Sequence, residues 1–223
     1  MKILAISDLH GKDYQIVADY IKENPVDLIV VAGDITHFGP VELAEDILNE
    51  LCSCKVPVLA VPGNCDPPEI YSKIENSQAI NIHGKNLTVK NIGICGFGGS
   101  NPTPFNTPLE FDELEIHKEL DKIMANTKGH EITLLVTHAP PYGTEVDKLA
   151  SGDYAGSKSI RKIIEKYKPD INICGHIHEA KSIDKIGNTI LVNPGELSEG
   201  FASLINITET NNKPEIDVKI VKL

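Results

Sequence analysis

The fold follows from one short stretch near the start of the chain, KILAISDLH at positions 2–10. A run of apolar residues leads there directly into two polar side chains, Asp8 and His10. The stretch DLIVVAGD at positions 27–34 repeats the arrangement, and the residues between have apolar side chains at helical spacing. Continuous apolar runs of this length are typical of strands buried on both faces of a parallel sheet. We therefore expect a strand–helix–strand unit with a right-handed crossover.

The alternation of strands and helices continues along the chain. We expect helices over 12–24, 40–51, 68–77, 109–126 and 157–168. We expect strands over 2–7, 27–32, 56–61, 131–137, 171–174, 181–186, 189–193, 202–208 and 214–222, with two or three more within 79–97. The first half predicts a mostly parallel sheet, and the strand-rich second half predicts an added antiparallel sheet. Two such sheets would pack face to face in a single domain, 1–223, with helices outside.

The overall charge restricts the partners that the protein can bind. Its 223 residues include 32 acidic and 21 basic side chains, which give a formal net charge of −11. Arg161 is the sole arginine, and tryptophan is absent. An acidic surface repels polyanions, so the composition argues against a protein that coats nucleic acid or lies on an anionic membrane.

The cysteines and the first residues indicate a cytoplasmic protein. Five cysteines are an odd number in a chain of this size, so a disulfide framework is not expected. The pair Cys52-x-Cys54 has no second pair at zinc-finger spacing. The apolar run at the start is too short for a signal peptide, and no stretch reaches the roughly 20 apolar residues of a membrane span.

Polar residues of one chemical kind follow five of the expected strands. They are Asp8 and His10, Gly33-Asp34, Gly63-Asn64-Cys65-Asp66, His138, and Gly175-His176-Ile177-His178. Loops at the carboxyl ends of strands gather on one side of an α/β sheet. We therefore expect these side chains to meet in one place.

The donor atoms suit a pair of divalent cations. Carboxylate, imidazole and amide groups bind manganese, iron, zinc or nickel, and of these we expect manganese; a magnesium site would rarely use so much histidine. Asp34 can give one oxygen to each cation. Each fragment alone is weak, because a Gly-Asp pair is commonly a turn and a lone histidine is commonly structural. The combination of all five is what predicts the site.

These motifs, in this order, resemble the calcineurin-like metallophosphoesterase family, and in particular its small bacterial and archaeal phosphodiesterases. The resemblance runs from residue 8 to residue 178, and Val192-Asn193-Pro194-Gly195 is also similar. It implies an α/β fold, a four-layer α/β/β/α sandwich with two facing mixed β-sheets.

The resemblance also implies a role for each ligand. Asp8, His10 and His178 would bind the first metal, Asn64, His138 and His176 would bind the second, and Asp34 would bridge them. The implied reaction is hydrolysis of a phosphoester by attack of a hydroxide bound to the binuclear centre. Asp34, Asn64 and His138 would thus be catalytic as well as structural.

One position departs from the family pattern. Many members have a histidine after the motif asparagine, where it protonates the leaving group; this chain has Cys65. A thiol is a poor hydrogen-bond donor. His37 is the nearest alternative catalytic donor in sequence, although it could be an ordinary exposed loop histidine. Cysteine at position 65 also resembles the family's small bacterial and archaeal phosphodiesterases, and this resemblance implies phosphodiesters rather than monoesters as substrates. Asp66 could orient a histidine or cap the next helix.

Two long loops, 98–108 and 140–156, would supply substrate contacts. The candidates are Asn101, Phe105, Tyr142, Asp153, Tyr154 and Ser157, the last of which could equally cap a helix. We expect a small phosphorylated substrate, no extended nucleic-acid binding and no membrane; a homo-oligomer is left open. Two alternatives differ in class: a non-catalytic protein-interaction scaffold on the same fold, and a nuclease that acts on strand ends.

Overall fold

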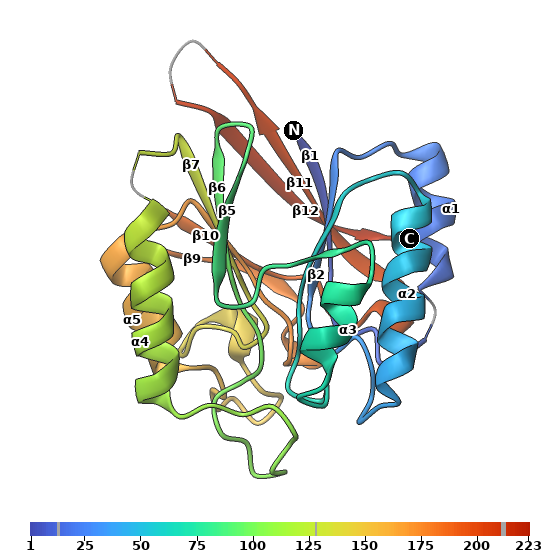
Figure 1. Ribbon diagram of the computed structural model, residues 1–223. Coiled ribbons are helices and arrows are strands. Elements are labelled where there is room, and N and C mark those ends of the chain that lie inside the picture. Colours follow the sequence, from blue (N-terminus) through green and yellow to red (C-terminus); the bar gives the residue numbers. More distant parts are fainter. Residues whose placement is uncertain (13, 128, 211–212) are drawn as a thin grey trace.

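A computed structural model describes residues 1–12, 14–127, 129–210 and 213–223 of the chain. Two six-stranded sheets face each other, and helices cover both outer faces (Figure 1). The first sheet has the order β12-β11-β1-β2-β3-β4. Its strands are β1 (Lys2–Ile6), β2 (Leu28–Ala32), β3 (Val58–Val61), β4 (Ile80–Asn81), β11 (Phe201–Thr208) and β12 (Glu215–Lys222). Its outer helices are α1 (Gln15–Glu23), α2 (Val41–Ser53) and α3 (Ile70–Asn76).

The second sheet has the order β5-β6-β7-β8-β10-β9. Its strands are β5 (Lys85–Val89), β6 (Ile92–Phe97), β7 (Ile132–Thr137), β8 (Ile171–Ile173), β9 (Ser182–Ile186) and β10 (Thr189–Asn193). The helices α4 (Glu113–Met124) and α5 (Lys158–Tyr167) cover it on the left of Figure 1. Short 3₁₀ turns are η1 (Ala125–Thr127), η2 (Glu145–Asp147), η3 (His178–Ala180) and η4 (Leu197–Glu199). The expected four-layer α/β/β/α arrangement is confirmed.

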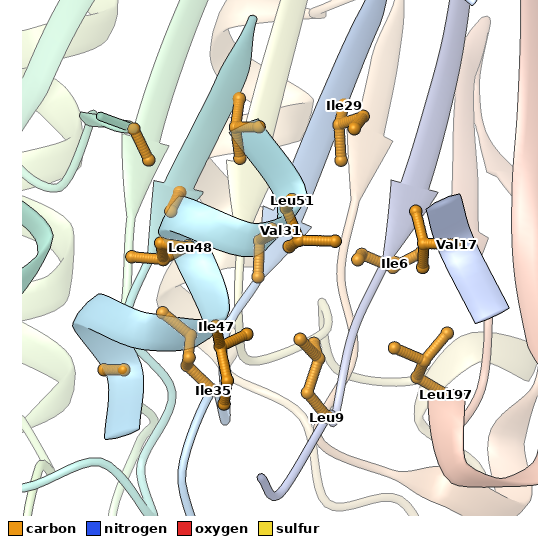
Figure 2. Packing of buried hydrophobic residues seen from close by; sticks show 14 of the residues in the cluster. Ile6, Leu9, Val17, Ile29, Val31, Ile35, Ile47, Leu48, Leu51 and Leu197 are labelled. Carbon is orange, nitrogen blue, oxygen red and sulfur yellow. The ribbon is translucent and has the colours of Figure 1, made fainter. Parts of the chain in front are cut away.

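The apolar strands are buried on both faces, because one face packs against helices and the other packs against the second sheet. In β1, Leu4 and Ile6 pack toward α1 and α2, whereas Ile3 and Ala5 pack between the sheets. Figure 2 shows the outer layer, in which Leu51 and its neighbours on α2 lie against β1 and β2. Each fully buried aliphatic side chain contributes about 1.5–3 kcal/mol of transfer free energy. The strand ends are therefore held by rigid elements.

The expected antiparallel second sheet is wrong at its centre. Strands β6, β7, β8 and β10 run parallel, and only β5 and β9 at the edges are antiparallel. The helices α4 and α5 are crossovers that join parallel neighbours, so the alternation of the first half continues through the second. The last hairpin instead returns to the first sheet, where β11 pairs antiparallel with β1.

Helix boundaries differ from the expected ones by a few residues. The helix expected over 12–24 spans Gln15–Glu23, and position 13 lies outside the described residues. The helix expected over 109–126 begins only at Glu113, because the Asp112 carboxylate accepts a hydrogen bond from the Glu115 N–H at 2.8 Å. The residues before it pair with the neighbouring loop instead: the Leu109 N–H donates to the Asn64 carbonyl. The region 79–97 contains three strands.

No helix within the described ranges is both long enough and apolar enough to cross a membrane.

Candidate metal centre

The loops after β1 and β2 hold their side chains through an unusual backbone. Asp8, His10 and Asp34 have φ values of 55°, 48° and 49°, and His176 after β8 has 69°. Left-handed φ at a residue other than glycine costs on the order of 1–3 kcal/mol, and such residues cluster at functional sites. The His10 N–H donates to the Asp34 carbonyl at 2.8 Å, so the two loops remain paired beyond the sheet.

Two of the glycines that precede the candidate ligands are required by close packing. A Cβ at Gly63 would lie 2.0 Å from Asp34 Oδ1. A Cβ at Gly175 would lie 1.8 Å from the Ser7 hydroxyl and 2.6 Å from Asp8 Oδ2. Real atoms cannot approach so closely, so the loops after β3 and β8 reach the carboxylates only because these positions lack side chains.

One group of ligand atoms surrounds a point between β1, β2 and η3. Asp8, His10, Asp34 and His178 each offer an atom within 4.8 Å of the others. His178 Nε2 lies 3.1 Å from His10 Nε2 and 3.3 Å from Asp8 Oδ1. Ligands bonded to one cation at about 2.1 Å lie at such separations from one another. These four side chains could hold one metal ion.

A second group lies on the other side of Asp34. His138 Nε2 is 2.9 Å from Asn64 Oδ1 and 3.4 Å from Asp34 Oδ1. The rings of His138 and His176 are 5.2 Å apart. The other Asp34 oxygen, Oδ2, is 3.7 Å from His10 Nε2. The two oxygens of this carboxylate thus face different ligand groups, as a bridging ligand requires.

The charge at the site calls for cations. Asp8 is 0% exposed and Asp34 is 2% exposed. Among the described residues, imidazoles alone form ion pairs with these two carboxylates; lysine and arginine do not. Burial opposes ionisation, yet His138 and His10 hold the pKa of Asp34 well below its usual range. Because two buried carboxylates without a fixed positive partner are costly, this donor set fits two bound divalent cations.

A hydrogen bond from Nδ1 fixes the orientation of the His138 ring. Its Nδ1 lies 2.8 Å from the Ala32 carbonyl, which can only accept, so Nδ1 carries a proton. Nε2 is therefore the nitrogen aimed at Asn64 and Asp34. Burial works against a charge on His138, but the Asp34 carboxylate outweighs it and raises the pKa to about 9. Burial, with the charge on His138, lowers the pKa of His176 to about 4, so that ring is neutral and able to ligate.

Asp66 connects the loops, and both roles predicted for it are wrong. It is fully buried and accepts hydrogen bonds from the N–H groups of Gly63, Ile35 and Thr36 and from the Thr36 hydroxyl, at 2.7 to 3.1 Å. These partners use both of its oxygens, so it neither orients a histidine nor caps α3. It fixes the loop that contains Asp34 against the loop that contains Asn64.

Sequence reasoning missed three side chains that orient the ligands. Glu196 Oε2 lies 3.1 Å from His178 Nδ1. Asn64 Nδ2 donates to the Thr107 hydroxyl at 3.0 Å, which in turn donates to Glu110 at 2.6 Å. A carboxylate directly after Gly195, at the end of another strand, was the available signal for Glu196. No motif in the sequence marks Thr107 or Glu110.

Five of the seven candidate ligands line an open pocket of about 490 Å³, whereas Asp8 and His138 are fully buried and do not line it. Its lining residues are His10, Lys12, Asp34, His37, Phe38, Asn64, Cys65, Phe105, Thr107, His176, His178 and Glu196. His37 is exposed, and its Nδ1 lies 3.2 Å from His10 Nδ1. Burial and the nearby Asp34 raise the pKa of Cys65, so it is a neutral thiol near pH 7.

Of the six residues predicted to contact substrate, Phe105 lines this pocket, whereas for the other five, which do not line it, substrate contact stays a prediction. The loop 140–156 is turned onto the buried Asp147, which accepts hydrogen bonds from the N–H groups of Gly143, Thr144 and Gly156. Ser157 caps α5 through the Ile160 N–H and donates its own hydrogen to Glu113. Helix capping is therefore sufficient to explain a serine at position 157.

The raised pKa of His138 makes metal binding pH-dependent. Below pH 9 the metal-free imidazole keeps an extra proton, which a cation must displace. We expect the apparent dissociation constant for Mn²⁺ to fall about tenfold per pH unit between pH 6 and 8. Calorimetry in buffers of different ionisation enthalpy measures the protons released. A His138→Asn variant keeps an oxygen ligand and should release one proton fewer; equal release from both proteins would contradict the assignment.

Comparison with known proteins shows the family of the chain. The model of the family described as calcineurin-like phosphoesterase matches residues 1–180. An uncharacterized protein of Methanocaldococcus jannaschii is 49% identical over 203 residues, which cover 89% of either chain. A Xenorhabdus bovienii protein named a probable cyclic nucleotide phosphodiesterase is 27% identical over 180 residues, 76% of this chain and 68% of its own.

A solved structure shares the fold. The crystal structure of the protein TT1561 of Thermus thermophilus superposes with a TM-score of 0.75 at 18% identity, over 99% of this chain and 98% of that one. The family match includes all five strand ends that carry the candidate ligands. The chain belongs to the calcineurin-like phosphoesterase family.

Proposed function

We propose that the protein is a phosphodiesterase that requires two divalent cations, with manganese as the expected metal. One observation carries the proposal: the two oxygens of Asp34 face separate groups of imidazole and carboxylate or amide donors at the floor of an open pocket. Family membership supports metal-dependent phosphoester hydrolysis. The name of the Xenorhabdus bovienii relative supports a diester substrate.

The candidate ligands would form two groups, one for each cation. Asp8, His10 and His178 would hold one cation, Asn64, His138 and His176 the other, and Asp34 both. When bound, the two cations supply a polarised water nucleophile and neutralise the phosphoryl oxygens. The groups around them keep this geometry: the Ala32 carbonyl and the Glu196 carboxylate orient imidazoles, and the Thr107 hydroxyl orients the amide of Asn64.

The residue at position 65 supports a diester. Burial and the nearby Asp34 raise the pKa of Cys65, so it offers no strong acid for a basic leaving group. Lys12 is the one lysine among the described residues that line the pocket, which include no arginine.

His37 is the group that we propose as proton donor to the leaving group. If His10 binds metal through Nε2, its Nδ1 must carry a proton, which it donates to His37 Nδ1 at 3.2 Å. That bond leaves Nε2–H as the donor that His37 can offer to a substrate in the pocket. The same bond makes His37 a positioning residue for His10.

The bridging role of Asp34 predicts loss of hydrolysis when one oxygen is replaced. With added Mn²⁺ and bis(p-nitrophenyl) phosphate, Asp34→Asn and His138→Ala should each lower kcat by at least about 10²-fold, because the first loses the bridging charge and the second loses a ligand. Asp19→Asn makes the same change on exposed α1 and should match wild type. Wild-type rates in both site variants would contradict the proposal. Full metal loading without hydrolysis of any phosphoester would instead favour a scaffold.

The role of His37 predicts a dependence on the leaving group. His37→Ala should slow diesters with alkyl leaving groups by about 10²-fold, but p-nitrophenyl diesters by less than about threefold, because p-nitrophenolate leaves without a proton. Adding Cys65→His to that variant should restore part of the alkyl rate. Equal losses for both substrates would leave His37 with only its positioning role.

A further inference from the structure

The Cys65 thiol lies beside the proposed centre, where its Sγ accepts a hydrogen bond from Asn64 Nδ2 at 3.7 Å. Its Sγ and the rings of His10 and His37 each offer a ligand atom within 4.8 Å of the other two. The two Nδ1 atoms are 3.2 Å apart. The thiol is not in a disulfide. Donors around a tetrahedral zinc ion, with bonds of about 2.0–2.3 Å, lie about 3.3–3.8 Å from one another, so small side-chain movements would close this group on a cation.

The donor types separate this cluster from the proposed binuclear centre. One sulfur and two imidazoles favour a soft cation such as Zn²⁺, whereas the carboxylate, amide and imidazole set also accepts manganese. The negative charges of Asp34, Asp66 and Asp8 act on the Cys65 thiol. They disfavour a free thiolate but attract a cation that would bind it. The Cys65 N–H donates to Asp34 Oδ1 at 2.8 Å, which fixes the backbone under the sulfur.

We propose that Cys65, His37 and His10 form a third, inhibitory metal site for a thiophilic divalent cation such as Zn²⁺. The cation binds Cys65 Sγ and the Nδ1 atoms of both imidazoles. The thiol proton and the proton between the two Nδ1 atoms pass to solvent, and no electron is transferred. His10 then binds this cation through Nδ1 while its Nε2 faces the first ligand group. His37 no longer has a free lone pair on Nδ1 to accept a hydrogen bond from His10. The metal site stands on the cluster alone, whereas its inhibitory effect rests on the proposed hydrolysis.

Cobalt provides a spectroscopic probe that is independent of activity. Adding Co²⁺ to the manganese-loaded protein should produce a thiolate-to-cobalt charge-transfer band in the near ultraviolet, because only the third site includes sulfur. The band should disappear in Cys65→Ser and persist in Cys54→Ser, a matched change of a half-buried thiol at the end of α2. Absence of the band in the wild-type protein, or its persistence in Cys65→Ser, would overturn the proposal.

A zinc titration measures the inhibition. Each variant's rate is normalised to its own zinc-free rate with Mn²⁺. Cys65→Ser should need at least about tenfold more zinc than wild type for half inhibition, since loss of a ligand costs at least as much affinity as loss of a group that orients one. Equal zinc sensitivity would refute the inhibitory role. If no phosphoester is hydrolysed at all, the proposed function fails while the cobalt band still decides whether the third site exists.

Discussion

Two buried carboxylates, Asp8 and Asp34, lie at the ends of adjacent strands. Their negative charge determines the pairing and the protonation of the imidazoles around them. Burying an ion costs several kcal/mol unless it is paired. The described side chains that pair with them are imidazoles, which can hold either a proton or a metal. Without a cation, Asp34 favours the protonated form of His138. With one bound, the proton would leave and the same nitrogen could serve as a ligand.

Most of the fold could be predicted, because apolar runs and helical spacing reflect burial that the structure also shows. The runs that end at Ile6 and Ala32 are buried on both faces, as expected of central parallel strands. The pairing of distant strands could not be predicted. Nothing local distinguishes a hairpin that extends the second sheet from one that returns to β1, as Phe201–Thr208 does. Nor does helical periodicity reveal that Asp112 delays the start of α4.

The candidate ligands could be found from the sequence because each follows an apolar run, so strand position and chemistry coincide. The groups that hold them could not be found in this way. Glu196 orients His178 and Thr107 orients Asn64 across contacts that depend on loop geometry. The roles predicted for Asp66 are wrong, since most of its hydrogen-bond donors belong to a loop some 30 residues away in the sequence. The sequence therefore indicates the candidate ligands of a site more readily than the side chains that orient those ligands.

The most direct test of a centre bridged by Asp34 is anomalous diffraction from crystals grown with Mn²⁺. The account predicts two manganese peaks about 3.5–4 Å apart, one beside His10 and His178 and the other beside Asn64 and His138, each bonded to a different oxygen of Asp34. A single peak, or two peaks that do not share Asp34, would contradict it.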